Sequence, residues 1–186
     1  MKKIAEAASF GVDYVQLREK DLPSRDLEWL AREAAERIRA SGSKTRLLIN
    51  SRTDVALAAG ADGLHLRSGD VSPEEVRRIW RAAKGREEPV VAVSCHTEGD
   101  VAAAEKAGAD FVVFGPVFGK GEGAETHATG LDLLRAVSRS KIPVLGLGAV
   151  ATENAALCAN AGASGIAGIR LFQSCNVAAA VAKLRG

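Results

Sequence analysis

The stretch AGADFVVF at residues 107–114 decides the fold, because closely similar stretches recur along the chain. Each copy places a glycine, and then an Asp or Ser, directly before a short apolar run. The copies are FGVDYVQL (10–17), AGADGLHL (59–66), AGADFVVF (107–114) and AGASGIAG (161–168). Their glycines lie 49, 48 and 54 residues apart. Each interval has room for two strand–helix units, so the repeat predicts a parallel α/β architecture.

The segments between the copies support this interpretation. Three further apolar runs lie there: RLLIN (46–50), PVVAVS (89–94) and IPVLGLG (142–148). Continuously apolar strands that alternate with helical patterns are typical of parallel sheets whose strands are buried on both faces. Together the apolar runs predict seven strands.

Helix signals fill the gaps between these strands. Residues 72–85 begin with Ser72 as the predicted N-cap, continue with Pro73 at the first helical position, and end at Gly85. Ser24 is predicted to cap another helix in the same way. Residues 2–9 are expected to form a helix that should follow a strand. We therefore predict that residues 1–186 form a single domain, a (β/α)8 barrel whose first strand is missing from this chain. An open doubly wound sheet is the alternative.

Composition excludes several classes of protein. The chain has 186 residues, 47% of them hydrophobic, and a net charge of +2, which is typical of a globular protein. No basic stripe suggests nucleic-acid binding, and no apolar run has the roughly 18 residues that a membrane span needs. The N-terminus lacks a signal peptide's apolar core, and the three cysteines form no disulfide or zinc pattern. We expect a cytoplasmic protein without nucleic-acid or membrane partners; it could form a homo-oligomer.

Polar residues follow each predicted strand, which is where (β/α)8 enzymes place their active sites. Arg18 and Lys20 follow the first strand, and two cations at the rim suit a phosphate or pyrophosphate. Asp70 could hold Mg2+ that bridges pyrophosphate oxygens. Gly148 and Gly168 follow the last two strands, where such barrels bind phosphate through main-chain N–H groups.

Other polar residues are expected to be structural. Asp13, Asp62 and Asp110 precede strands at the opposite end of the barrel, where residues usually serve stability. His65 alternates with leucines in its strand and is expected to be hydrogen-bonded in the core. Cys95 is expected to be a small buried side chain rather than a nucleophile.

Six motifs in order resemble a known family: VQLREK, LIN-R-DVALAAGADGLHL, VSCHT, AGADFVVFGPVF, IPVLGLG and GASGIAG. They are similar to thiamine phosphate synthases and the related TenI thiazole tautomerases over nearly the whole chain. The resemblance implies a (β/α)8 barrel that normally has a first strand. It also implies a Mg2+-dependent transferase that joins hydroxymethylpyrimidine pyrophosphate to a thiazole phosphate and releases pyrophosphate.

The resemblance also implies residue roles. The segment with Gln16, Arg18 and Lys20 is expected to contact the pyrimidine pyrophosphate, and Asn50 its pyrophosphate group. Asp70 corresponds to a Mg2+ aspartate, Ser94 to a serine near the pyrimidine, and Gly148 to a glycine at the thiazole phosphate site. Among these we assign the catalytic roles to Lys20, Arg18 and Ser94.

Several positions depart from the synthase pattern. Ser51 stands where a second Mg2+ aspartate is usual, and could be only a weak ligand. Lys120 is expected to replace a loop lysine that contacts substrate. Arg170 stands where the family has a serine, and could bind phosphate as a cation. Pro116 stands where the tautomerases have a histidine.

Three alternatives therefore stay open. RSGDVSPEEVRR (67–78) resembles the tautomerase branch, an isomerase that would need His96 or His127 as its general base. A non-catalytic barrel that binds thiamine precursors would explain the departures from both branches. A different phosphate-binding barrel is a reading at the level of fold alone.

Overall fold

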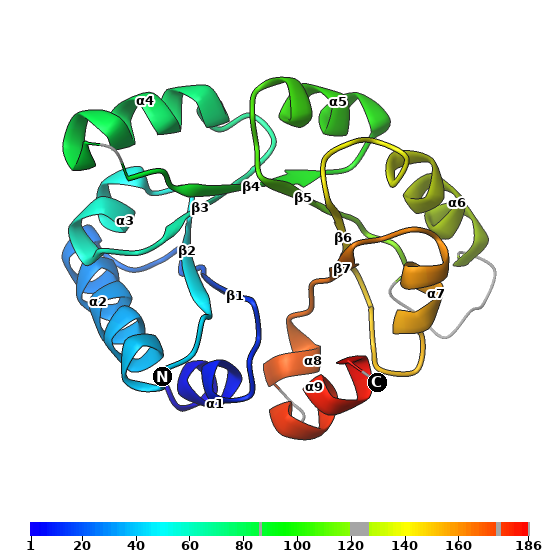
Figure 1. Cartoon of the computed structure of the whole chain (residues 1–186), viewed down its shortest axis with the longest axis horizontal. Coiled ribbons are helices and arrows are strands. Elements are labelled where there is room, and N and C mark those ends of the chain that lie inside the picture. The colour runs from blue at the N-terminus through cyan, green and yellow to red at the C-terminus, as the bar shows by residue number, and fades with distance from the viewer. Residues whose placement is uncertain (86, 120–126, 174–175, 186) are drawn as a thin grey trace.

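The computed structural model describes residues 1–85, 87–119, 127–173 and 176–185, without the side chains of 127–129. Figure 1 shows a strongly curled parallel sheet with helices around its outer face. The strands are β1 (Tyr14–Leu17), β2 (Arg46–Asn50), β3 (Gly63–Leu66), β4 (Val90–Cys95), β5 (Phe111–Phe114), β6 (Val144–Gly146) and β7 (Gly165–Ile166). They pair side by side in chain order, every pair parallel. The seven predicted strands are confirmed.

Helices connect these strands and continue beyond the last of them. They are α1 (Lys2–Ser9), α2 (Ser24–Ala40), α3 (Thr53–Ala59), α4 (Pro73–Lys84), α5 (Glu98–Lys106), α6 (His127–Val137), α7 (Ala155–Asn160), α8 (Arg170–Gln173) and α9 (Val177–Arg185). The predicted helix at residues 2–9 is confirmed. Because the helices lie outside the curl, the described residues do not form a doubly wound sheet, which has helices on both faces.

The curl brings distant strands together. The rings of Tyr14 in β1 and Phe111 in β5 lie 4.7 Å apart between centroids, although three strands separate them in the sheet. Leu48, Ala92 and Val113 belong to one buried cluster with Phe111, and it fills the space inside the sheet. Gly63 is required there, because a Cβ atom on it would lie 1.9 Å from the Val90 carbonyl oxygen.

The outward faces of the strands pack under the helices. Leu47, Ile49 and Leu64 are at most 1% exposed and join the apolar faces of α2, α3 and α4, including Val76 and Trp80. A second cluster covers β4 to β6 in the same way, with Phe114 and Leu134 at its centre. This arrangement of two apolar layers explains why the strands read as continuous apolar runs.

The sheet is open between β1 and β7. Each of these strands pairs with one neighbour among the described residues, and the helices α1, α8 and α9 lie at the opening (Figure 1). Ala7 of α1 packs there against Val177 and Val181 of α9. The described residues thus form a curled seven-stranded sheet, and closure by an eighth strand remains a prediction.

Local helix signals were confirmed in one case and wrong in another. The Ser72 hydroxyl accepts a hydrogen bond from the Glu75 N–H at 3.2 Å, and Pro73 begins α4 as predicted. Ser24, in contrast, is the first residue of α2, and Pro23 occupies the N-cap position. The Ser24 hydroxyl accepts a hydrogen bond from Arg52 instead, because the curl brings the start of α3 beside it.

Among the described residues, no helix is long and apolar enough to cross a membrane.

Candidate functional site

Four predicted site residues form one hydrogen-bonded chain at the carboxyl ends of β1 to β3. Gln16 Nε2 donates to Asn50 Oδ1 at 3.0 Å, and Asn50 Nδ2 donates to Ser51 Oγ at 3.1 Å. Ser51 Oγ in turn donates to Asp70 Oδ2 at 2.5 Å. Gln16, the adjacent pair Asn50 and Ser51, and Asp70 come from three strand–helix units, and the curled sheet brings them together.

Ser51 is held in an uncommon main-chain conformation. Its φ angle is 58°, in the left-handed region that few residues other than glycine adopt. Its N–H donates to the His65 carbonyl oxygen at 3.1 Å, which ties the turn after β2 to β3. This turn points the hydroxyl of Ser51 at Asp70.

Asp70 has a second partner that the sequence reading missed. Arg67 donates to its carboxylate through the main-chain N–H at 2.7 Å and through Nη2 at 2.9 Å. Burial alone would raise the pKa of the Asp70 carboxyl, but hydrogen bonds from Arg67 and Ser51 outweigh it, and the pKa lies below its ordinary value. The two residues close one turn, in which the Asp70 N–H donates to the Arg67 carbonyl oxygen at 3.1 Å, and the turn sequence Ser-Gly-Asp was the available signal. Asp70 is therefore a carboxylate at neutral pH.

A second pair lies on β3 and β4. His65 is 7% exposed, and its Nε2 hydrogen-bonds to Ser94 Oγ at 2.8 Å. Burial lowers the pKa of His65 to about 4, and the positive charge of Arg18 adds to this effect. His65 is therefore neutral at pH 7, and the prediction of a hydrogen-bonded core histidine is confirmed. The effect of Arg18 also shows that this cation lies near the pair.

The remaining cation of the first strand unit lies at the edge of this region. Lys20 is exposed in the turn after β1, as Arg18 is. Neither side chain makes a hydrogen bond or ion pair with the described residues. The described contacts thus connect Arg18 with the site only through the effect of its charge on His65.

The glycines predicted to bind phosphate lie on the other half of the rim. Gly148 has a φ angle of 108°, and a Cβ atom there would lie 2.6 Å from Pro116 Cα. Gly168 is equally confined, since its Cβ would lie 2.9 Å from Leu171 Cβ. Tight packing already explains both glycines, so their phosphate contacts remain predictions. Arg170 begins the short helix α8 and is exposed.

Other candidates have structural partners or lie outside the description. The His96 ring hydrogen-bonds to the Gly115 carbonyl oxygen, and its main-chain N–H is bound by Asp100. Cys95 is fully buried, and burial with the charge of Asp100 raises the pKa of its thiol to about 12, so it is no nucleophile at neutral pH. Lys120 lies outside the described residues, as does the side chain of His127.

The metal prediction has a restricted ligand set. Among the described residues, no group of three or more His, Cys, Asp or Glu side chains could hold a metal ion. The oxygens near one another are those of the Asp70 carboxylate and the Ser51 hydroxyl, whereas the Asn50 amide turns its nitrogen to Ser51 and its oxygen to Gln16. Mg2+ is often bound by one or two carboxylates together with substrate phosphates and water. The residues present therefore fit a one-carboxylate site completed by a phosphorylated ligand.

Comparisons with known proteins agree with this picture. Residues 1–172 match the thiamine monophosphate synthase family. A thiamine-phosphate synthase of Moorella thermoacetica is 35% identical over 188 residues, which cover 100% of this chain and 86% of that protein. One of Syntrophomonas wolfei is 35% identical over 169 residues, or 90% of this chain and 78% of that protein.

Solved structures give the same result for the fold. A thiamine phosphate pyrophosphorylase from Pyrococcus furiosus superposes with a TM-score of 0.81 at 27% identity, covering 99% of this chain and 86% of that one. A 3-hexulose-6-phosphate synthase superposes at 0.70 with 18% identity, which is a likeness of fold alone. The match over most of the chain and the identity to full-length relatives lead to one conclusion: this chain belongs to the thiamine monophosphate synthase family.

Proposed function

We propose that the protein is a Mg2+-dependent thiamine phosphate synthase. It would join hydroxymethylpyrimidine pyrophosphate to a thiazole phosphate and release pyrophosphate. The observation that carries the proposal is the continuous chain Gln16–Asn50–Ser51–Asp70 beside the Ser94–His65 pair. It supplies amide, hydroxyl and carboxylate groups at one rim, with Arg18 and Lys20 above it.

The proposed reaction exchanges one bond for another. The bond between the pyrimidine methylene carbon and the pyrophosphate oxygen breaks, and its electron pair leaves with pyrophosphate. The thiazole nitrogen then gives its lone pair to the methylene carbon, which forms the new C–N bond. Negative charge therefore grows on the leaving group, and fixed cations that are aimed at it lower the barrier.

The residues of the rim divide this work. Arg18 and Lys20 bind the pyrophosphate oxygens, Arg18 with the paired donors that suit phosphate. Gln16 and Asn50 orient the same group by hydrogen bonds. Mg2+, when bound through Asp70 with Ser51 as a weak ligand, would neutralise charge on the pyrophosphate.

The pyrimidine and thiazole ends have separate contacts. Ser94 is proposed to hydrogen-bond the pyrimidine, with its hydroxyl oriented by the neutral ring of His65. Gly148, Gly168 and Arg170 are proposed to bind the thiazole phosphate on the far half of the rim, with Lys120 as a further cation. Ser94 lies on β4, whereas Gly148 and Gly168 follow β6 and β7, so the two substrates would meet across the rim.

The test is an assay of purified protein with both substrates and Mg2+, in which thiamine phosphate is measured by fluorescence after oxidation. The proposal expects product only with Mg2+, and the loss of pyrophosphate release in Asp70→Ala. Asp132→Ala is the matched control, because that carboxylate is exposed on α6 and its ion pair is with Arg135 rather than with a residue of the site. An unchanged rate in Asp70→Ala would contradict the metal assignment.

The tautomerase alternative rests on the loss of one metal carboxylate at Ser51. It predicts isomerisation of a thiazole carboxylate phosphate without a metal. The described site offers His96 as a base, but its ring already bonds the Gly115 carbonyl oxygen. Isomerisation that survives EDTA, without any synthase product, would favour this alternative; ligand binding without turnover would favour a non-catalytic barrel.

We also propose that the fold is a (β/α)8 barrel, in which an eighth strand enters the opening between β1 and β7. Among the residues that the structure describes, each of these two strands pairs with a neighbour on one side only, and such open edges are normally paired or covered. Gln16, which points toward the site, is exposed at this opening, whereas every residue of β3 and β5 is buried. A strand there would enclose the site on its open side.

A further inference from the structure

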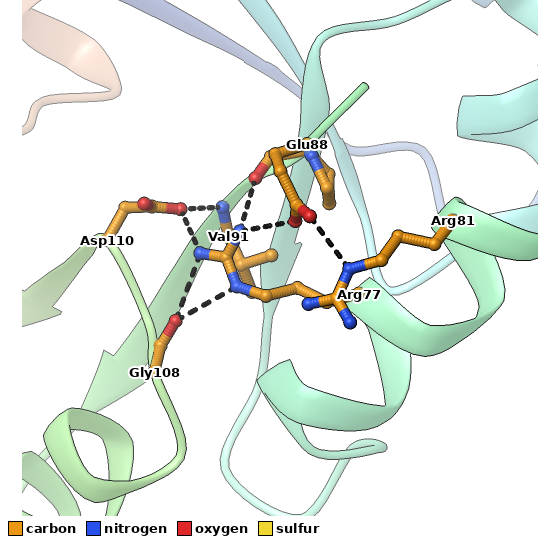
Figure 2. A network of polar contacts seen from close by, with 7 residues as sticks. Arg77, Arg81, Glu88, Val91, Gly108 and Asp110 are labelled. Atoms are coloured by element: carbon orange, nitrogen blue, oxygen red, sulfur yellow. Dashed lines mark hydrogen bonds and ion pairs between the residues drawn. The ribbon is translucent and has the colours of Figure 1, made fainter. Parts of the chain in front are cut away.

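A complete clamp joins β4 and β5 at their amino ends (Figure 2). Arg77 reaches from α4 and donates to the Gly108 carbonyl oxygen through Nε at 3.2 Å and through Nη2 at 3.0 Å. The same Nη2 donates to Asp110 Oδ2 at 2.8 Å. Asp110 Oδ2 also accepts the main-chain N–H of Val91 at 2.7 Å. The clamp thus has three parts: an arginine, a Gly-x-Asp turn, and the first residues of the preceding strand.

The aspartate of this turn sets the position of that strand. Asp110 forms two hydrogen bonds with Val91, which we call the gripped residue. The Asp110 carboxylate accepts the Val91 N–H, and the Asp110 N–H donates to the Val91 carbonyl oxygen at 2.8 Å. Asp62 grips Leu47 in the same way, with distances of 2.7 Å and 2.9 Å. In both cases the next residue of the gripped strand pairs with the residue after the aspartate. A Gly-x-Asp turn in this fold therefore fixes the register of the strand before it.

The Gly-x-Asp turn before β1 also binds an arginine, but among the described residues no strand pairs with β1 on that side. Arg185 reaches from α9 and donates through Nη2 to the Gly11 carbonyl oxygen and, at 3.0 Å, to Asp13 Oδ2. Gly11 and Gly108 share a φ angle of 78°. Among the described residues, β1 pairs only with β2, so nothing occupies the place that Val91 has beside Asp110.

The flanking helices repeat the arrangement too. Arg77 lies on the helix before β4, and α5 follows that strand to the Gly-x-Asp turn. In the same order around the curled sheet, Arg185 lies on α9, and α1 leads to the turn at Gly11. Within the described part of the chain, the first set has a strand between its two helices and the second set has none.

We propose that Asp13 and Arg185 are a docking clamp for one parallel strand, an extended segment that leads into α1 and enters the opening beside β1. This inference rests on the eighth strand proposed above and names what holds it. Arg185 fixes the Asp13 carboxylate, and Asp13 then accepts the N–H of the first paired residue of the strand. The strand cannot have proline at that position, because proline has no N–H.

The two complete clamps also predict the side chains of this strand. Val91 and Leu47, the gripped residues, point outward under the helices, and the residues after them point into the sheet. The gripped residue of the new strand would therefore meet the apolar cluster of Ala7, Val177 and Val181. Its next residue would lie opposite Tyr14 and face inward. We expect apolar side chains at the gripped residue and two positions later.

The test adds such a strand to the whole chain. A Val-rich segment of about five residues is joined in front of Met1 by a Gly-Ser turn, which suits the usual length of a strand. The same extension is placed on Asp13→Ala, and a Gly-Ser extension of equal length is the control. Asp13 is exposed, so its substitution should leave the chain folded. The measurements are thermal unfolding and amide hydrogen exchange of Tyr14–Leu17.

The proposal expects the Val-rich extension to raise Tm by on the order of 5 °C, judged from the size of the chain, and to slow exchange in β1. In Asp13→Ala most of that gain should disappear, as it should when the gripped residue is proline. If the extension neither raises Tm nor slows exchange in the parent chain, the eighth strand itself is wrong. If the extension raises Tm equally in Asp13→Ala, the eighth strand is supported, but Asp13 does not hold it and the proposed clamp is wrong.

Discussion

The two ends of the same strands use polar residues in opposite ways. At the carboxyl ends, Gln16, Asn50, Ser51 and Asp70 bond mainly to one another's side chains. At the amino ends, Asp62 and Asp110 bond to main-chain N–H groups of the neighbouring strand. Side-chain partners can turn to a ligand, whereas a main-chain partner cannot leave without opening the sheet. The comparison teaches that one end is free to do chemistry while the other holds the strands together.

The largest expected effect is at the carboxyl end, on activity alone. Arg18→Ala should lower kcat/KM for the pyrimidine pyrophosphate by roughly 100-fold to 1,000-fold, because a cation near the developing charge is removed. Tm should change little, since the side chain is exposed. Arg39→Ala, an exposed arginine near the last residue of α2, is the matched control. A large fall in Tm with normal kcat/KM would reverse the assignment of the two ends.

The next effect is at the amino end, on stability alone. Arg77→Ala should lower the free energy of unfolding by about 2–3 kcal/mol, because Asp110 and the Gly108 carbonyl oxygen lose a charged donor. That corresponds to a fall in Tm of roughly 4–12 °C for a chain of this size. Urea unfolding measures it, and kcat per folded molecule should stay at the parent value. A loss of activity without a loss of stability would contradict the comparison.

A pH effect on stability is expected from His65, which lies between the two ends of β3. Its folded pKa of about 4 lies below the ordinary value of about 6.5, so the unfolded chain binds the extra proton first. Above pH 6.5 the neutral His65 does not lower the free energy of unfolding. As the pH falls from 6.5 toward 4, the unfolded chain takes up a proton that the folded chain does not, and the free energy of unfolding decreases. The loss should reach about 2–3 kcal/mol. Urea unfolding at several pH values should show a shallower slope in His65→Gln, and an equal slope would exclude His65 as the source.

A smaller effect should sharpen the metal assignment. Ser51→Asp adds a second carboxylate beside Asp70 and should lower the Mg2+ concentration for half-maximal synthase activity by roughly tenfold. Ser9→Asp, at the last residue of α1, is the control for added charge. Mg2+ titration of both variants measures the effect. An unchanged midpoint in Ser51→Asp would mean that this side chain does not face the metal.

The smallest effect is expected at an exposed ion pair of the helical layer. Glu75→Gln breaks the exposed ion pair with Arg78 on α4 and should change neither Tm nor kcat/KM measurably. Exposed pairs of this kind are screened by water and salt. A clear change in either quantity would mean that the helical layer takes part in what we assign to the strand ends.

Much of the architecture could be predicted from the repeat. Glycine followed by Asp or Ser before an apolar run marks the start of a strand, and this local signal located β1, β3, β5 and β7. The Ser72–Pro73 signal located α4, because capping depends on neighbouring residues alone. The prediction that Ser24 caps α2 failed for the opposite reason. The Ser24 hydroxyl binds Arg52, which lies 28 residues further along the chain and is brought beside Ser24 by the fold.

The sequence predicted which residues lie at the candidate site, but it did not predict which of them form hydrogen bonds with each other. The position of a residue after a strand predicts that it reaches the rim, and this located Gln16, Asn50, Ser51 and Asp70. Which residues bond to each other depends on the stagger of neighbouring strands, which the sequence pattern does not show. The His65–Ser94 bond, which joins β3 to β4, was therefore missed.

The sequence by itself determined the number and order of strands, the helices that separate them, and the end of each strand at which chemistry is expected. Those features follow from local rules: strand periodicity, helix capping, and the left-handed glycine before each repeat. Tertiary structure alone decided that Ser51 bonds Asp70, that His65 bonds Ser94, and that Arg185 meets Asp13 from the far end of the chain. These contacts join residues that lie from 19 to 172 positions apart, because curling of the sheet, rather than any local preference, brings them together.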